Sequence, residues 1–464
     1  MTPDALTQTA PLPRPSALTA AQARDPDYFP GMAMAVPLGI QHILAMFVSN
    51  LTPAIIVAGA AGFGFGSHDT SQMIYMIQMS MLFAGIATLL QTIGLGPIGA
   101  RLPLVQGTSF AYISVMVPIV AGKGPAGMAA LTTAALCGGL FHAALSRFVG
   151  RIRFALPPLV TGLVVLMIGL SLMRIGVEYS AGGVTAIGTP AFGAGESWLL
   201  AGTVVMVTLG LKFFAKGIWS TASVLLGLAS GYGLAMAMGR VDFAPVAQAG
   251  LVMVPMPFHF GFELSASAIV GFCLTGFVSS IETIGDVEVI CENAAGRRAT
   301  DRELEGSVAA DGVGTALAAV FGAMPNTTFS QNVGLIAMTG MMSRHVVTLG
   351  AVILVICGLL PRIGAIITTI PIEVLGGGVI VMFGMVASSA LSMLSAVAWN
   401  QRNMLIFGVA LSLSLGLQLE PAALSHLPET LRILLTSGVI PAAVIAVVLN
   451  LVLPHGLEEP LANA

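Results

Sequence analysis

Apolar runs of about 20 residues recur along the chain from Gly31 to Leu453, and this recurrence limits the possible folds more than any other feature. In a helix, a run of about 20 residues crosses about 30 Å of hydrocarbon. Of the 464 residues, 56% are hydrophobic and only 8% are charged, whereas a soluble domain carries about 25% charged residues. Because so few charges cannot cover an aqueous surface, the sequence predicts an all-α polytopic membrane protein in a lipid bilayer.

Charge and cysteine content argue against several kinds of partner and cofactor. The formal net charge is -3, no basic stripe occurs, and aromatic residues make up 6% of the chain, so nucleic acid is not expected as a partner. A disulfide framework or a zinc site is not indicated either, because no CxxC spacing occurs among the four cysteines, Cys137, Cys273, Cys291 and Cys357. The sequence therefore points to no metal and no cofactor.

Hydropathy and the breaks between runs place fourteen spans along the chain. The first seven fall at about 34–62, 72–95, 105–119, 126–148, 157–176, 198–215 and 219–238. The second seven fall at about 266–290, 306–322, 331–341, 345–367, 373–397, 403–418 and 432–454. An even number of spans puts both termini on the same side of the membrane.

The distribution of basic residues sets which side that is. Most of the 18 lysines and arginines fall in the loops that are inward when the amino terminus is inside, so we expect both termini to be cytoplasmic. Residues 1–30 are rich in proline and alanine and lack the pattern of a cleaved signal peptide. They are interpreted as a disordered cytoplasmic tail, and residues 457–464 as a second cytoplasmic tail.

Two segments are too short and too polar to be ordinary spans. They are Gln106–Tyr112 (QGTSFAY) and Pro325–Asn332 (PNTTFSQN), and each precedes an apolar run. They share a Thr-Ser/Thr-Phe core and stand third in each set of seven, as a 7+7 inverted repeat predicts. Interrupted segments at matching positions indicate a transporter's binding site, because non-helical backbone at membrane depth must be buried in protein or reached by water.

Ionisable side chains inside spans cost about 2.5 kcal/mol or more at mid-bilayer, so each one needs a reason. The candidates are His42, Glu282, Asp286, Asp311 and Glu373. Glu282 and Asp286 are four residues apart and therefore share one helical face. We interpret Glu282 as a substrate-facing carboxylate. Asp286 lies nearer the cytoplasmic end and is either functional or part of a solvated helix end.

The remaining three candidates are Asp311, His42 and Glu373. Asp311 opens its predicted span, where it is either a helix-end carboxylate or a member of a proton relay. His42 lies deep in the first span, where a histidine exchanges protons near neutrality or serves as a structural residue. Glu373 follows Pro371 at the start of a span and is expected to be interfacial.

The interrupted segments also supply groups suited to a planar heterocycle. Gln331 and Asn332 each carry a carboxamide with a donor and an acceptor. A purine dione presents alternating N–H and C=O groups, and a carboxylate such as Glu282 accepts a hydrogen bond from a ring N–H. Phe110 either stacks on such a ring or packs in the core.

These residues resemble the motifs of the nucleobase/ascorbate transporter family. Ser330–Gly340 (SQNVGLIAMTG) is similar to the family signature, Gln/Glu-Asn-x-Gly-x4-Thr followed by Arg, Lys or Gly. Four further motifs resemble the family in the same order: Gln41-His42, the Gln-Gly-Thr-Ser-Phe segment, Glu-Thr-Ile-Gly-Asp in the eighth span and Asp-Gly in the ninth. The resemblance covers the chain from about residue 31.

The resemblance implies fourteen segments in two inverted repeats, arranged as a core domain and a gate domain. The core comprises residues 31–150 (spans 1–4) and 263–370 (spans 8–11), and the gate comprises residues 151–262 (spans 5–7) and 371–456 (spans 12–14). It further implies a homodimer, an elevator-like movement of the core and proton-coupled uptake across the bacterial inner membrane, with sodium left open as the coupling ion.

Site roles follow from the same motif positions. Glu282 and Gln331 would hold the base, Asn332 would support the tenth segment, and His42 and Asp311 would tune proton coupling, with Asp286 as a further candidate. Gln331 is typical of the xanthine and uric acid carriers, whereas relatives that carry uracil tend to have Glu. Ser109 stands where many xanthine carriers have Asn and leaves room for the extra oxygen of uric acid, so both purines remain possible.

Three alternatives stay open at this point. One is a permease of the same family for uracil or another nucleobase. A second is an intramembrane enzyme, although no HExxH or GxSxG motif occurs in the sequence. The third is an anion carrier of the sulfate-transporter fold, which the carboxylate of the inferred pocket disfavours.

Overall fold

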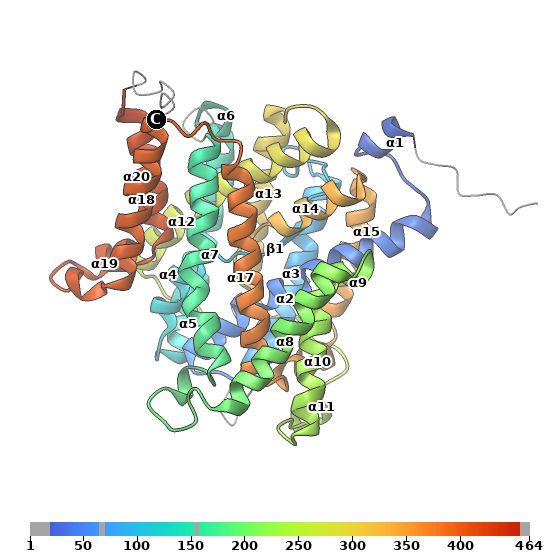
Figure 1. Cartoon of the computed structure of the whole chain (residues 1–464), viewed down its shortest axis with the longest axis vertical. Coiled ribbons are helices and arrows are strands. Elements are labelled where there is room, and N and C mark those ends of the chain that lie inside the picture. Colours follow the sequence, from blue (N-terminus) through green and yellow to red (C-terminus); the bar gives the residue numbers. More distant parts are fainter. Residues whose placement is uncertain (1–18, 65–69, 153–156, 455–464) are drawn as a thin grey trace, which may run out of the picture.

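The computed structural model describes residues 19–64, 70–152 and 157–454, and in this part the regular elements are helices apart from two three-residue strands (Figure 1). The predicted tail over residues 457–464 lies outside the described residues. In the first half the membrane helices are α2 (Met32–Ala61), α3 (Ser71–Ile93), α4 (Ile113–Val120), α5 (Gly124–Leu145), α7 (Pro158–Ser180), α8 (Gly195–Phe214) and α10 (Ser223–Ala237). Strand β1 (Gln106–Thr108) precedes α4, and the shorter helices are α1 (Ala20–Arg24), α6 (Val149–Ile152), α9 (Ile218–Thr221) and α11 (Ala244–Gln248).

The second half repeats this order. Its helices are α12 (Ala266–Ile290), α13 (Asp301–Val320), α14 (Ser330–Thr339), α15 (Arg344–Gly358), α16 (Pro361–Thr368), α17 (Ile372–Leu394), α18 (Gln401–Leu419), α19 (Glu429–Thr436) and α20 (Val439–Val452). Strand β2 (Asn326–Thr328) precedes α14 as β1 precedes α4.

The packing of the helices shows that the two halves form an inverted repeat. Helix α5 packs on α13, and the corresponding pair α15 and α3 packs in the same way. The contact between α5 and α12 corresponds to the contact between α15 and α2. Helix α7 packs on its own counterpart α17, and strand β1 pairs with its counterpart β2. Each contact is therefore reproduced when the halves are exchanged. The predicted 7+7 fold with a core and a gate is confirmed, whereas the domain boundaries stay predictions.

The number of spans also stays a prediction, and two spans differ from their expected form. By length and composition, eight helices of the described residues are able to cross a membrane, or up to ten if each bent pair counts as one span. The predicted spans at 345–367 and 432–454 each consist of two helices with a bend between them: α15 and α16 meet at 77°, and α19 and α20 at 80°. Pro361 breaks the first, because it has no N–H and restricts Leu360 before it; Gly438, with φ of 72°, breaks the second.

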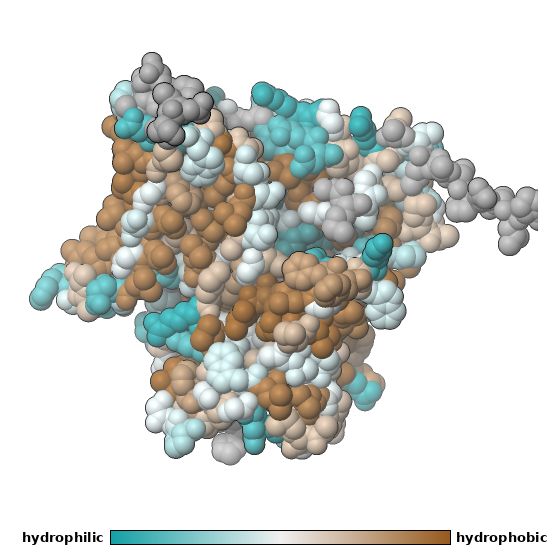
Figure 2. All heavy atoms as spheres, in the orientation of Figure 1, coloured by the Kyte–Doolittle hydropathy of each residue, from teal (hydrophilic) through white to brown (hydrophobic). Residues whose placement is uncertain are grey.

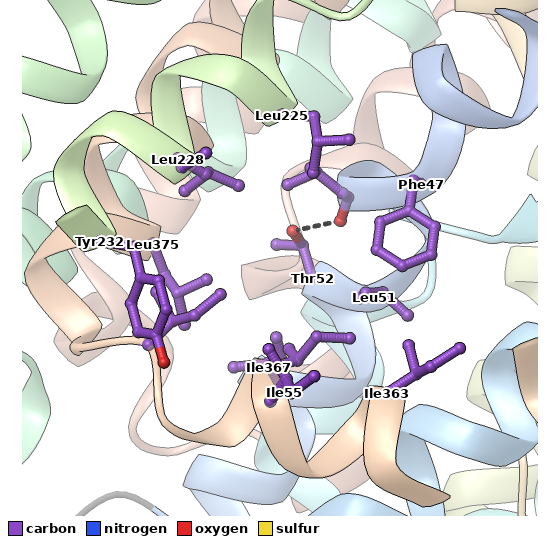
Figure 3. A pocket seen from close by; sticks show the side chains of 14 residues that line it. Phe47, Leu51, Thr52, Ile55, Leu225, Leu228, Tyr232, Ile363, Ile367 and Leu375 are labelled. Carbon is purple, nitrogen blue, oxygen red and sulfur yellow. Dashed lines mark hydrogen bonds between the residues drawn. The ribbon is translucent and has the colours of Figure 1, made fainter. Parts of the chain in front are cut away.

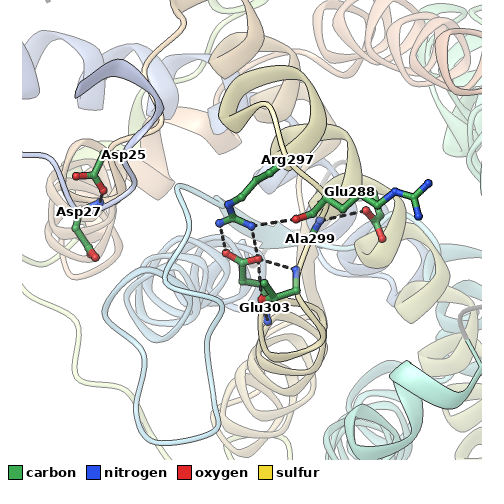
Figure 4. A network of polar contacts seen from close by, with 8 residues as sticks. Asp25, Asp27, Glu288, Arg297, Ala299 and Glu303 are labelled. Carbon is green, nitrogen blue, oxygen red and sulfur yellow. Dashed lines mark hydrogen bonds and ion pairs between the residues drawn. The ribbon is translucent and has the colours of Figure 1, made fainter. Parts of the chain in front are cut away.

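Helix α13 begins earlier than expected because of its polar cap. Thr300 accepts a hydrogen bond from the Glu303 amide at 3.3 Å, and the Glu303 carboxylate accepts one from the Thr300 amide at 2.8 Å. The Arg297 guanidinium contacts both Glu303 oxygens at 2.8 and 2.5 Å (Figure 4). This capping box starts the helix at Asp301, five residues before the apolar run that marked the predicted span at 306.

The expectation of a disordered tail does not hold for residues 19–30, while residues 1–18 lie outside the described residues. The Met342 amide donates to the Ala23 carbonyl at 2.8 Å, and the Arg344 amide donates to the Pro26 carbonyl at 2.9 Å. Arg344 also forms an ion pair with Asp27 at 2.6 Å. Composition did not reveal this docking because backbone amides and one ion pair make it, with few apolar side chains involved.

Apolar side chains cover the flanks of the bundle. On α8, Met206, Phe213 and Phe214 are 71%, 76% and 89% exposed, and Leu413 on α18 is 50% exposed. Figure 2 shows hydrophobic residues gathered over α18 and α20, with hydrophilic residues near the end that carries α6. A soluble monomer rarely exposes such large apolar patches. The flanks therefore face lipid, as expected for a multi-pass membrane protein.

Small residues allow the closest approach between the halves. A Cβ atom at Gly312 on α13 would lie 2.2 Å from the amide nitrogen of Ala143 on α5 and 2.8 Å from the Gly139 carbonyl oxygen. The two backbones therefore touch, which is the usual basis of helix association in membranes.

Gly312→Ala is expected to lower the stability of the protein by about 1–3 kcal/mol, because α5 and α13 must separate to admit the methyl group. The measurement is the thermal unfolding midpoint of the protein purified in detergent. Gly202→Ala on α8 serves as the control, since a Cβ there meets nothing within 4 Å. Equal midpoints for the two variants would contradict the close packing.

Candidate substrate site

The two strands join the repeats at the centre of the molecule. They are antiparallel, with Gln106 opposite Thr328 and Thr108 opposite Asn326. Two more bonds extend the pairing: the Ser109 amide donates to the Pro325 carbonyl at 2.8 Å, and the Phe329 amide donates to the Val105 carbonyl at 2.9 Å. Helices α4 and α14 follow the strands, so each repeat starts a short helix near the same point. Helix amino termini carry partial positive charge and are common at transporter sites.

A small polar cavity lies beside the β1–β2 pair. Its volume is about 20 Å³, and it is lined by Phe110, Ile168, Glu282, Thr327, Phe329, Ser330, Gln331, Val386 and Ser389. Most of these residues belong to the predicted core, whereas Ile168 on α7 and the two α17 residues belong to the predicted gate. A volume of this size holds about one water molecule. A larger ligand therefore requires the core and gate walls to move apart.

Two phenylalanines at equivalent positions of the repeats form one wall. The rings of Phe110 and Phe329 are stacked with their centroids 6.4 Å apart and an interplanar angle of 10°. Phe383 on α17 meets Phe110 edge-on at 5.4 Å. Gly107 lies beneath Phe329, since a Cβ at Gly107 would be 2.6 Å from that ring. The wall offers flat aromatic surface to a planar ligand.

The two carboxylates of α12 have different surroundings. Glu282 lines the cavity and is 9% exposed, whereas Asp286 is 1% exposed and does not line it. Asp286 accepts a hydrogen bond from the Ser330 hydroxyl at 2.8 Å, which ties α12 to the start of α14. The alternative of a solvated helix end at Asp286 is therefore wrong. Asp286 is not at a helix end because α12 continues to Ile290, four residues beyond this carboxylate.

Asp311 lies in the middle of α13 and outside the cavity lining. One carboxylate oxygen accepts from the Gln106 amide at 2.6 Å and is 3.5 Å from the Thr328 hydroxyl, and the other accepts from Thr283. The helix-end alternative for Asp311 is wrong, because the cap at Thr300 starts the helix ten residues earlier. Asp311 thus joins β1, β2 and α12 through one buried carboxylate.

His42, Asn332 and Ser109 also lie outside the cavity lining. The Asn332 amide donates to the His42 carbonyl at 3.0 Å and lies 3.1 Å from its Nδ1 atom, so α14 is held to α2. Ser109 is fully buried in the strand pairing. Glu373 lies in the first turn of α17, is 5% exposed and pairs with Arg240 at 2.9 Å, and its interfacial position stays a prediction.

Sequence reasoning missed several residues that shape the site. Phe329 and Ser330 were part of the quoted repeat but received no role, although Ser330 holds Asp286. Gln106 and Thr283 bind Asp311 from separate elements. Ser389 on α17 lines the cavity from the gate. Gln106 and Thr283 had a usable signal, since each is a polar residue within a motif quoted above.

A larger cavity, of about 240 Å³, lies between α2, α10 and α16 (Figure 3). Aliphatic and aromatic side chains make up most of its lining. Of the two hydroxyls among its lining residues, Thr52 donates to the Val48 carbonyl at 2.9 Å and Tyr232 contacts Thr369 at 2.6 Å. Both are already bonded, so this cavity has no group that selects a polar substrate. The small cavity at Glu282 is the better candidate.

The family model Xan_ur_permease, described as a permease family, matches residues 33–422, most of the chain. The chain belongs to the nucleobase/ascorbate transporter family. Within this family it is 35% identical over 428 residues to the xanthine permease XanP of Escherichia coli strain K12, covering 89% of this chain and 90% of the relative. It is 36% identical over 420 residues to the uric acid permease PucJ of Bacillus subtilis strain 168, covering 89% and 91%.

A solved structure supports the fold of this nucleobase/ascorbate transporter. The transmembrane domain of the cyanobacterial bicarbonate transporter BicA aligns with a TM-score of 0.55 and 15% identity, covering 90% of this chain and 96% of that domain. At this identity the likeness concerns the fold alone. Because the family and the relatives bear the names of transporters, the chain is a transporter and the enzyme alternative is not favoured.

Proposed function

We propose that this chain carries an oxidised purine, xanthine or uric acid, across the bacterial inner membrane together with a proton. One observation carries the proposal: Glu282 and Gln331 line one cavity beside two stacked phenylalanines, at the boundary between core and gate. The relatives named as xanthine and uric acid permeases support the same substrate class.

The chemistry of the cavity suits a purine dione. Glu282 supplies a charged acceptor for a ring N–H, and the Gln331 carboxamide supplies a donor and an acceptor for the alternating edge of the base. The rings of Phe110 and Phe329 bury the flat face. Uracil presents a smaller face to this wall, so the uracil alternative is the second choice.

The mechanism we propose is an elevator movement. The core walls of the cavity stand on α12, β2 and α14, and the gate walls on α7 and α17. Since the cavity of about 20 Å³ is too small for a purine, the core must shift along the gate to admit and release substrate. Dimer formation and cytoplasmic termini belong to the same proposal.

Proton coupling is assigned to Asp311, with His42 and Asp286 as supporting groups. Gln106 and Thr283 donate to Asp311, and a carboxylate uses acceptor oxygens for both bonds. A proton on Asp311 replaces one acceptor site by a donor and so weakens a bond to Gln106 or Thr283. The protonation state would thus alter how firmly β1 is held against α12 and α13.

Uptake of radiolabelled xanthine and urate by cells that express the protein tests this proposal. We expect saturable uptake of at least one purine, competition by the other, and loss of accumulation on adding a protonophore. Competition by uracil alone would favour the uracil alternative. Accumulation that depends on sodium and survives the protonophore would overturn the choice of ion.

Gln331→Glu is expected to weaken purine transport, because the amide donor becomes an acceptor that faces the same edge of the base. The loss should reach roughly 10-fold in apparent affinity, which corresponds to about 1.4 kcal/mol. The measurement is the KM for xanthine and urate, with the amount of protein in the membrane as the control. Normal uptake of both purines would remove Gln331 from the site.

A further inference from the structure

A second cavity adjoins the substrate cavity and shares Gln331 with it. Its volume is about 160 Å³, against about 20 Å³ for the first. Its walls again come from both domains, with Gln331 on α14 facing Met385 on α17 and the short helix α9. We name it the Lys212 chamber after its basic residue, and its polar lining consists of Lys212, Ser220, Thr221, Ser223 and Gln331.

The hydroxyl groups of two of these residues are already engaged. Thr221 accepts from the Gln41 amide at 2.7 Å and is 3.2 Å from the Gly217 carbonyl oxygen, and Ser220 donates to the Lys212 carbonyl at 3.2 Å. They shape the chamber but have limited capacity to bind a ligand. The groups that remain are the Lys212 ammonium, the Gln331 carboxamide and the Ser223 hydroxyl, and of these only Lys212 carries a charge.

The charge of the chamber is positive. No carboxylate lines it, and within the described residues no ion pair is formed by Lys212. The neighbouring substrate cavity instead contains the carboxylate of Glu282. An anion that approaches Glu282 is repelled by it, and an unpaired ammonium on the adjoining side of Gln331 offsets that repulsion. A charged group between low-dielectric walls raises the local concentration of the oppositely charged ligand.

We propose that the Lys212 chamber is a second binding subsite, which receives the substrate as an anion and thereby favours urate over xanthine. The inference rests on the proposed function and names the ionic form of its substrate. Uric acid has lost a proton at neutral pH and is an anion, whereas xanthine is largely neutral. The predicted topology puts Lys212 on the cytoplasmic side, so the chamber lies on the path between Gln331 and the cytoplasm.

Equilibrium binding of radiolabelled urate and xanthine to the purified full-length protein tests the inference. We expect Lys212→Gln to lower the ratio of urate affinity to xanthine affinity about 5-fold at low salt, which corresponds to about 1 kcal/mol for an exposed ion pair. Lys212→Arg should restore the ratio to within about 2-fold, because the charge is kept. Lys216→Gln is the matched control, since this exposed lysine lies four residues further along, just after the end of α8, and does not line the chamber.

Salt gives a second measurement that needs no variant. Raising the ionic strength should reduce the urate preference of the unmodified protein towards that of Lys212→Gln, because Lys212 is exposed and its field is screened. An unchanged ratio in Lys212→Gln, or an equal loss for both purines, would overturn the inference alone. Failure of the unmodified protein to bind either purine would overturn the proposed function and the inference with it.

Discussion

Glu282→Gln is expected to weaken purine binding roughly 10-fold to 150-fold while the protein still folds. The substitution keeps the shape of the side chain but exchanges a charged acceptor for a neutral amide, and hydrogen bonds to charged groups contribute about 1.5–3 kcal/mol. Because Glu282 lines the cavity between core and gate, the loss falls on binding itself. The measurement is equilibrium binding of xanthine and urate to purified protein.

Glu263→Gln is the matched control for this prediction, since Glu263 is exposed and does not line the cavity. It should bind both purines as the unmodified protein does. Binding by Glu282→Gln within a factor of two of the unmodified protein would remove Glu282 from the substrate site. The same result would mean that the apolar lining of the cavity, rather than its carboxylate, accounts for purine binding.

Asp311→Asn is expected to abolish proton-driven accumulation while equilibrium binding stays within a few-fold of normal. The amide oxygen of an asparagine is still able to accept from Gln106, and its NH₂ group is able to donate to Thr283, so the contacts of the site are retained. An asparagine does not take up a proton at any accessible pH. The measurement is accumulation in cells with an imposed proton gradient, beside binding to purified protein.

Facilitated exchange separates this prediction from simple inactivation. In Asp311→Asn, exchange of internal for external purine should persist without a gradient, because exchange needs the movement of the core but no net proton transfer. Loss of binding in Asp311→Asn, together with normal binding in Glu282→Gln, would reverse the roles assigned to the two carboxylates.

The sequence was sufficient for the repeat, whereas only Glu282, Gln331 and Phe110 of the predicted substrate residues line the cavity, and their roles stay predictions. The interrupted segments predicted the position of β1 and β2, because polar residues at membrane depth are rare and must be compensated. The spacing of Glu282 and Asp286 placed both on one face of α12. The position of the interrupted segments and the shared face of the two carboxylates could be predicted because each depends only on residues that are close together in the sequence.

Contacts between distant elements were beyond such reasoning. The partners of Asp311 come from β1 and α12, and the residues near Asp311 in the sequence do not indicate that Gln106 is its donor. The bends at Pro361 and Gly438 were hidden because hydropathy averages over a window and responds to side chains rather than to backbone breaks. The docking of residues 19–30 was missed for a similar reason, as main-chain hydrogen bonds leave no trace in composition.

The contact between Gly107 and Phe329 makes the choice of residue in one half of the chain depend on the residue in the other half. A side chain at position 107 would occupy the space of the Phe329 ring, so a larger residue there is tolerated only with a smaller one at 329. Positions 107 and 329, which stand at the centre of the two repeats, therefore limit the size of each other's side chains.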